Sequence, residues 1–227
     1  NILIIYFIDF MIESRVEKKF VFGINYSDFI KKILLVNNFK ILYPDRHIHS
    51  IYIDTLNFDS VKDNINGVSQ RKKLRIRWYN DDFDNIYFET KNKKNFFVWK
   101  HIKKISTCLN QKNLINYIQD LLSHPNEIID SNYNYKMILK VKYKRNYFIS
   151  NDGKIRATID TEINTSSAKS INKMITLPET ILEFKFSPNS ESYFRNFFSY
   201  RGLNIRSKKY SKYIQSFIAL DESGLIS

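Results

Sequence analysis

Several stretches of the chain alternate apolar or aromatic residues with charged ones, and the alternation is clearest at residues 73–78, 86–91 and 155–160. Successive side chains of a β-strand point to opposite faces of the sheet, so this period of two predicts half-buried strands. Similar patterns predict the remaining strands, at residues 15–23, 50–55, 137–149 and 181–186.

Helices are predicted between and after these strands. Ser27 can cap a helix that carries Ile30, Ile33 and Leu34 on one face, and apolar residues share a face over residues 114–122. Two more helices are predicted at residues 191–200 and 208–217. Seven or eight strands spread along the whole chain predict an α+β fold, mainly antiparallel β, in which a closed eight-stranded tunnel barrel has flanking helices.

Composition favours one domain and an anionic partner. The chain has 227 residues, of which 43% are hydrophobic, enough for the core of a single domain. Lys and Arg number 36 against 23 Asp and Glu, a formal charge of +13. Such an excess suits nucleic acid, a phosphate polymer or an acidic membrane surface, and it does not choose among them.

Cysteine and histidine provide no chemistry that the sequence can identify. Cys108 is the single cysteine, which excludes an intramolecular disulfide, and it reads as an inert cytosolic thiol. His47 and His49 lie two apart in a stretch expected to be a polar loop, without the nearby Cys or clustered acids of a metal site. We therefore assign these three residues no role.

The first residues are apolar but short. They carry Asp9 and span far fewer than the roughly 20 residues that a transmembrane helix needs, and they lack the basic start and small-residue cleavage site of a secretory signal. We expect Met11 to be the natural start and residues 1–10 to be an upstream extension or a truncated end.

Charged residues recur at positions i and i+2 in five of the predicted strands, which places each set on one face. A single set is most often a ladder of charges on the solvent face of a sheet. Five sets in a barrel can instead point inward around one axis. The residues expected there are the cations Lys19, Arg75, Arg77, Lys91, Arg145, Arg156, Lys185 and Lys212 and the acids Glu17, Glu89, Asp160 and Glu183.

In this set the cations outnumber the acids, so ion pairing within the barrel leaves positive charge in excess. Burying unpaired cations is prohibitive without a resident anion. The arginine fork binds phosphate oxygens in pairs and lysine acts as a point charge, so a chain of phosphates matches this lining better than one carboxylate. No glycine-rich phosphate loop occurs in the sequence.

These residues carry a resemblance to the polyphosphate-polymerase domain of the vacuolar transporter chaperone (VTC) family, within the CYTH-like triphosphate tunnel metalloenzyme superfamily. Eight matches follow in order along nearly the whole chain: residues 17–20 (EKKF) to E-x-K-Y, 50–55 (SIYIDT) to S-x-Y-F-D-T, 71–79 (RKKLRIRWY) to R-x-K-x-R-x-R-x-Y, 88–91 (FETK) to E-x-K, 143–145 (YKR) to Y-x-R, 154–161 (KIRATIDT) to V-R-x-T-x-D, 182–185 (LEFK) to L-E-x-K, and 211–213 (SKY) to S-K-Y.

Two departures refine the resemblance. Arg15 stands where the thiamine-triphosphatase and adenylate-cyclase branch has the first glutamate of E-x-E-x-K, which favours the polymerase-like branch. Lys93 stands where the polymerase family often has a histidine, and Lys100 is the next candidate contact.

The resemblance implies a domain over residues 11–218, with a C-terminal tail at residues 219–227. It implies a metal-dependent enzyme that transfers the γ-phosphoryl group of ATP to a growing polyphosphate chain and releases ADP. The eight cations above would be the catalytic residues, Glu183 would hold Mn²⁺ or Mg²⁺, and Glu17 and Glu89 could share that duty. The residues expected to contact the bound cofactor are Lys93, Lys100, Tyr143, Lys209 and Ser211.

The expected partners are ATP and polyphosphate, with a separate membrane protein as a further partner of a cytoplasmic domain. Specific binding of nucleic acid is not expected, because inward charge pairs do not make an exposed basic stripe. A non-catalytic module that binds polyphosphate or a nucleotide, and a triphosphate hydrolase on the same fold, stay open as alternatives. Aromatic residues beside basic ones, such as Tyr147 near Arg145, could stack nucleobases, although most such aromatics pack in a core.

Overall fold

The computed structural model describes residues 15–95, 97–105, 111–124, 133–170, 172–199 and 206–226. The predictions for residues 1–10 and for Cys108 lie outside this part of the chain. The strands are β1 (Val16–Gly23), β2 (Phe39–Thr55), β3 (Gln70–Tyr79), β4 (Ile86–Lys94), β5 (Phe97–Ile105), β6 (Tyr135–Ser150), β7 (Ile155–Ser167), β8 (Met174–Thr176) and β9 (Glu179–Phe186). The helices are α1 (Ser27–Val36), α2 (Asp59–Ile65), α3 (Gln111–Ser123), α4 (Glu191–Ser199) and α5 (Lys212–Glu222), with short 3-10 turns at Ile24–Tyr26 and Pro188–Ser190.

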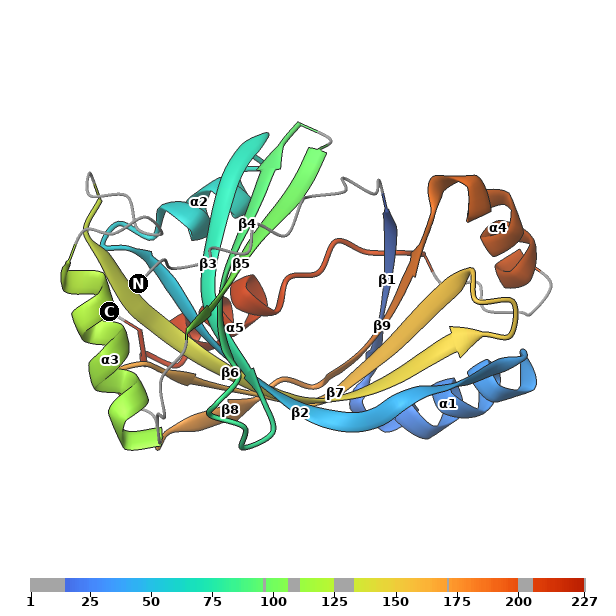
Figure 1. Ribbon diagram of the computed structural model, residues 1–227, viewed down its shortest axis with the longest axis horizontal. Coiled ribbons are helices and arrows are strands. Elements are labelled where there is room, and N and C mark those ends of the chain that lie inside the picture. The colour runs from blue at the N-terminus through green and yellow to red at the C-terminus, as the bar shows by residue number, and fades with distance from the viewer. Residues whose placement is uncertain are drawn as a thin grey trace, which may run out of the picture.

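The strands form one antiparallel sheet in the order β1-β9-β7-β6-β2-β3-β4-β5, with β8 paired to β7. The sheet curls into a trough whose two arms end in β1 and β5 (Figure 1). The predicted mainly antiparallel α+β fold is confirmed. Within the described residues, however, the sheet has nine strands instead of eight, and backbone hydrogen bonds do not join β5 to β1.

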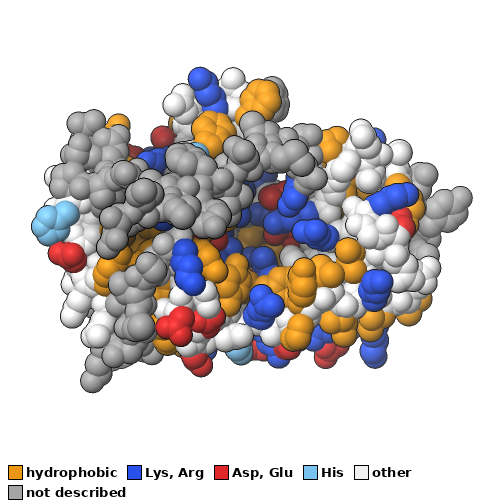
Figure 2. All heavy atoms as spheres, in the orientation of Figure 1, with side chains coloured by type: hydrophobic (Ala, Val, Ile, Leu, Met, Phe, Trp, Pro, Cys, Tyr) orange, Lys and Arg blue, Asp and Glu red, His pale blue; other side chains and the backbone are white. Residues whose placement is uncertain are grey.

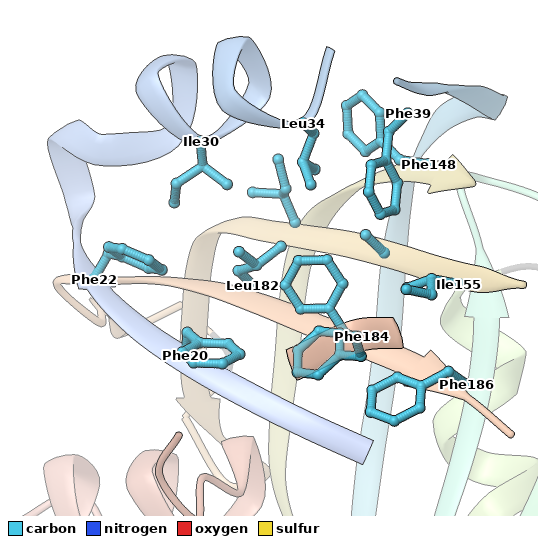
Figure 3. Packing of buried hydrophobic residues seen from close by; sticks show 13 residues of the cluster. Phe20, Phe22, Ile30, Leu34, Phe39, Phe148, Ile155, Leu182, Phe184 and Phe186 are labelled. Carbon is cyan, nitrogen blue, oxygen red and sulfur yellow. The ribbon is translucent and has the colours of Figure 1, made fainter. Parts of the chain in front are cut away.

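The convex face of one arm packs against α1 and α4. Ile30 and Leu34 of α1 point onto a layer of phenylalanines from the sheet (Figure 3). Phe194 of α4 stacks on Phe186, with ring centroids 4.5 Å apart, and also meets Phe184 at 5.2 Å. These apolar residues alternate along β7 and β9 with charged ones, so the same strands supply a dry outer core and a charged inner face.

Two further cores complete the fold. The convex face of the other arm packs its apolar residues against Leu114 and Ile118 of α3. The C-terminal helix α5 lies instead against the concave face, where Tyr213 stacks on Tyr52 at 4.7 Å between ring centroids. The Tyr213 hydroxyl donates to Asp54 Oδ2 at 2.8 Å, which fixes α5 to β2.

Several local predictions were wrong. The first half of β2, all of β5 and β8 were not predicted, and His47 and His49 lie within β2 instead of in a loop. Ser27 is the first residue of α1 and Tyr26 takes the cap position, without a side-chain cap bond. Residues 208–211 were predicted to be helical but have no regular secondary structure, and Lys208 N donates to Lys19 O of β1 at 2.9 Å.

None of the helices in the described ranges is long and apolar enough to cross a membrane.

Candidate functional site

The concave face of the sheet carries the charged residues singled out by the period-two pattern. Lys and Arg side chains, with some acidic ones, gather in a hollow between the two arms (Figure 2). The site therefore consists of the inward-facing residues of β1, β3, β4, β5, β6, β7 and β9, together with the start of α5.

One part of the site is an arginine pair on β3 that holds a glutamate from β4. Arg75 donates through Nε to Glu89 Oε2 at 2.8 Å and also through a guanidinium NH₂ group, while Arg77 Nη1 lies 3.7 Å from Glu89 Oε1. Lys100 of β5 lies 4.0 Å from the same carboxylate. Burial opposes ionisation of Glu89, but the charges of Arg77 and Arg75 outweigh it and lower its pKa to about 2.

A second part joins β6, β7 and α5. Arg145 holds Asp160 in a bidentate pair, with its Nη2 2.7 Å from Oδ2, and Lys212 Nζ contacts the same oxygen. Asp160 has no exposed surface. Burial acts against its charge, yet Arg145 and Lys212 hold its pKa well below the usual range. Both cations also lie over the Tyr143 ring, at 5.3 and 4.6 Å from its centroid.

A third part has looser pairing. Lys185 Nζ lies 3.6 Å from Glu17 Oε1 and 3.4 Å from Glu183 Oε1, so one ammonium group serves two carboxylates. Lys91 of β4 reaches across the gap between the arms to Glu17 Oε2 at 3.8 Å. Burial opposes ionisation of Glu183, but Lys185 and Lys19 lower its pKa to about 2.

Lysines crowd one another along this face. Burial, reinforced by the charges of Lys91 and other nearby cations, lowers the pKa of Lys73 to about 7. Burial and Arg75 lower the pKa of Lys100 to about 8, and burial also lowers the pKa of Lys91. Burial and neighbouring positive charges therefore act together against the charged form of these lysines.

The carboxylates do not form a complete metal cage. In the part of the chain that the structure describes, no group of three or more His, Cys, Asp or Glu is placed to hold a metal ion. Glu17 and Glu183 share Lys185, whereas Glu89 belongs to the separate arginine pair. Two carboxylates fit a divalent ion that takes its other ligands from phosphate and water, so Glu17 and Glu183 are the pair suited to hold one.

The structure brings together most of the residues predicted from the sequence. Lys100, Tyr143 and Ser211 also lie at the site, where Ser211 Oγ accepts from Lys73 Nζ at 2.9 Å. Arg156 is exposed and pairs through the backbone with Lys185 in the β7–β9 register. Lys209 is also exposed.

Lys93 lies two residues beyond Lys91 on β4 and is paired in register with Val98. Among the described residues, no ion pair joins it to an acid. Lys73 was not predicted as a site residue, although it lies two positions before Arg75 and thus on the same strand face. Its spacing could have identified it.

Comparison with solved structures identifies the fold. A proposed adenylyl cyclase from Hippeastrum, described as having a dominant triphosphatase activity, superposes with a TM-score of 0.56 at 13% identity, covering 94% of this chain and 98% of that one. A protein from Pyrococcus horikoshii gives 0.55 at 15% identity, covering 92% and 99%. A candidate adenylate cyclase from Bacillus halodurans gives 0.57 at 13%, covering 90% and 97%. At these identities the likeness shows the fold alone.

Among curated proteins, none matches the chain at a significant level. The family model of the VTC domain matches residues 15–220, which include every charged residue of the site. The chain therefore belongs to the VTC domain family, and its fold is that of the CYTH-like triphosphate tunnel proteins.

Proposed function

We propose that this domain binds a triphosphate in the hollow between its arms and transfers the γ-phosphoryl group of ATP to a growing polyphosphate chain. In this reaction ATP is the phosphoryl donor and polyphosphate is the acceptor.

The observation that carries the proposal is the excess of inward cations over inward acids. The cations are Lys19, Lys73, Arg75, Arg77, Lys91, Lys100, Arg145, Arg156, Lys185 and Lys212, and the acids are Glu17, Glu89, Asp160 and Glu183. Burial first, and then the charges of neighbouring cations, lower the pKa values of Lys73 and Lys100, so the charged forms of these lysines are disfavoured without a ligand. A polyanion stabilises these charged forms, and a linear chain of phosphates fits charges spread over several strands.

Phosphoryl transfer requires mainly positioning and charge stabilisation. In the proposed roles, the four inward arginines hold phosphate oxygens, and Lys19, Lys91, Lys185 and Lys212 neutralise the developing charge. A terminal oxygen of polyphosphate attacks the γ-phosphorus and forms the new P–O bond. The bond from the γ-phosphorus to the β–γ bridging oxygen breaks, and its electrons leave with ADP.

We assign a divalent cation, Mn²⁺ or Mg²⁺, to Glu183 and Glu17. Glu89 is less suited, because both of its oxygens face arginines. Held there, the ion would act as a Lewis acid that stabilises the negative charge of the phosphates. The carboxylates must first be released from Lys185, which phosphate can attract instead.

Triphosphate hydrolysis is the second candidate function. It is favoured by the structural neighbour from Hippeastrum, which is described as having a dominant triphosphatase activity. The same cations would hold the triphosphate while water instead of a polymer end attacks. A module that binds without turnover is the third candidate, and a separate membrane protein partner stays a prediction.

The test is to incubate the purified chain with ATP and Mn²⁺ or Mg²⁺, resolve polymer on gels, and count ADP and free phosphate in parallel. Glu183→Gln keeps the shape and removes the charge. The matched control is Glu191→Gln, which changes a glutamate of α4 on the convex side. Polymer with ADP, lost in Glu183→Gln only, supports the polymerase. Free phosphate without polymer means a hydrolase, and tight binding without either product means a binding module.

A further inference from the structure

A small aromatic cluster lies on β2 and β6 outside the three apolar cores. Tyr43 and Tyr147 meet edge to face, with ring centroids 5.8 Å apart. The Arg46 guanidinium lies over both rings, 5.7 Å from the Tyr43 centroid and 5.9 Å from that of Tyr147. Tyr43 is 50% exposed and Arg46 is exposed, so these groups do not serve as core packing.

The cluster adjoins the phosphate-facing residues. Tyr147 follows Arg145 by two positions on β6 and therefore shares its inward face. In the β6–β7 register Tyr147 pairs with Thr158, and in the β2–β6 register Arg46 pairs with Arg145. Alternate residues of a strand are about 7 Å apart. A nucleotide whose phosphate binds Arg145 can therefore place its base against Tyr147.

The order of features along β6 gives the cluster a direction. Leu139 and Val141 pack in the core around α5, Tyr143 lies beneath Lys212, Arg145 holds Asp160, and Tyr147 comes next. The cluster thus lies on the side of Arg145 away from α5, toward the end that α5 does not fill.

A local irregularity of β2 forms the cluster. The β2–β6 ladder shifts register between Ile41 and Tyr43 and again between Tyr43 and Arg46. Bulges of this kind turn side chains and are frequent beside active sites. The ion pair between Asp45 Oδ2 and Lys144 Nζ, at 2.8 Å, anchors the shifted segment on the opposite face. As a result, Tyr43 and Arg46 both meet Tyr147.

From this geometry we infer that Tyr43, Arg46 and Tyr147 form the nucleobase subsite of the bound nucleoside triphosphate, an inference that rests on the proposed function. Tyrosine rings and a guanidinium plane are the groups on which bases stack. Stacking tolerates any base because every base has a π-face, so the cluster favours a nucleobase without selecting adenine over guanine. The subsite distinguishes a nucleotide donor from an inorganic polyphosphate, which has no base.

The test compares ATP with tripolyphosphate, which carries the same phosphates without the nucleoside. Calorimetry gives the dissociation constants of both ligands. It is carried out on the full chain in three forms: the native sequence, Tyr43→Ala and Tyr147→Leu. We expect each variant to weaken ATP binding about five- to a hundredfold, as loss of one stacking partner does. Tripolyphosphate binding should change less than about twofold.

The matched control is Tyr26→Ala, which removes a tyrosine of similar exposure, 51%, that packs on Phe29 of α1. It should leave both affinities unchanged. Equal losses for ATP and tripolyphosphate, or no loss for ATP, would overturn the base subsite while leaving triphosphate binding intact. A native chain that binds neither ligand would instead overturn the proposed function, and the subsite with it.

Discussion

The inward glutamates of the sheet are held in two different ways. Glu89 is fixed by the forked guanidinium groups of Arg75 and Arg77, whereas Glu183 and Glu17 share the single ammonium of Lys185. Arginine holds a carboxylate in a fixed plane, while lysine is a flexible point charge. The difference teaches that the cation opposite a carboxylate decides its role. A carboxylate held by arginine stabilises the fold, whereas one held by lysine can leave its partner and bind a metal ion.

The largest expected effect is on catalysis, and it tests whether the carboxylate held by lysine binds the metal ion. Glu183→Gln should lower the rate of ATP turnover on the order of a hundredfold and raise the Mn²⁺ concentration needed for half-maximal rate, because a metal ligand is lost. Glu89→Gln should leave that Mn²⁺ concentration unchanged. Titrating the metal in both variants measures this. If Glu89→Gln alone shifts the metal requirement, our assignment of the two carboxylates is reversed.

The carboxylate held by arginine should contribute to the free energy of unfolding. Glu89→Gln leaves Arg75 and Arg77 without their buried counter-charge, so the free energy of unfolding should fall by about 3 kcal/mol. Glu17→Gln removes a half-exposed partner and should cost less than about 1 kcal/mol. Urea unfolding followed by circular dichroism measures both. Equal losses of unfolding free energy in the two variants would show that arginine and lysine hold these carboxylates equally firmly.

The pH dependence of stability gives a check on Glu89. Its pKa is about 2 in the folded chain against an ordinary value of 4.5. Its contribution is therefore fully present above pH 4.5 and is lost as the pH falls toward 2. The native chain should lose stability over this window more steeply than Glu89→Gln does.

The crowded lysines should make triphosphate binding depend on pH. Lys73 has a pKa of about 7 without ligand, and a bound phosphate raises it, so binding takes up protons above pH 7. ATP affinity should fall about tenfold between pH 7.5 and 9. Calorimetry in buffers of different ionisation enthalpy measures the uptake. Lys73→Met should remove most of both effects, and an unchanged pH profile in this variant would exclude Lys73 as the source.

Another small effect concerns a carboxylate that is held by hydrogen bonds. Asp54 accepts from the Tyr213 hydroxyl and from the backbone N–H groups of Ser60 and Val61. Tyr213→Phe removes one of these bonds and should lower the free energy of unfolding by about 1 kcal/mol. Tyr52→Phe keeps the stacked ring pair and serves as the control in the same urea experiment. A loss as large as that of Glu89→Gln would show that α5 depends on this bond.

Much of the site could be predicted because it rests on strict alternation. Arg75, Arg77, Glu89 and Lys185 occupy strands in which apolar neighbours are buried on the other face, so the period of two fixes their direction. The same alternation predicted the antiparallel sheet.

Other parts follow no such pattern. β5 is an edge strand whose Phe97 and Ile102 remain exposed, so hydrophobicity does not mark its faces. The first half of β2 contains Pro44 and two register shifts, which break the alternation. Partner choice also depends on tertiary position: no local spacing indicates that Asp160 meets Lys212 from α5.

Because β5 and β1 are not joined by backbone hydrogen bonds, the wall of the hollow is held together by two kinds of interaction. Elsewhere neighbouring strands are joined by ladders of backbone hydrogen bonds, which added salt hardly weakens. Among the described residues this gap is bridged by side chains instead, notably the half-exposed pair of Lys91 and Glu17. Exposed ion pairs are screened as ionic strength rises. One stretch of the wall of the hollow is therefore held by ion pairs, and we expect the hollow to widen there as the salt concentration rises.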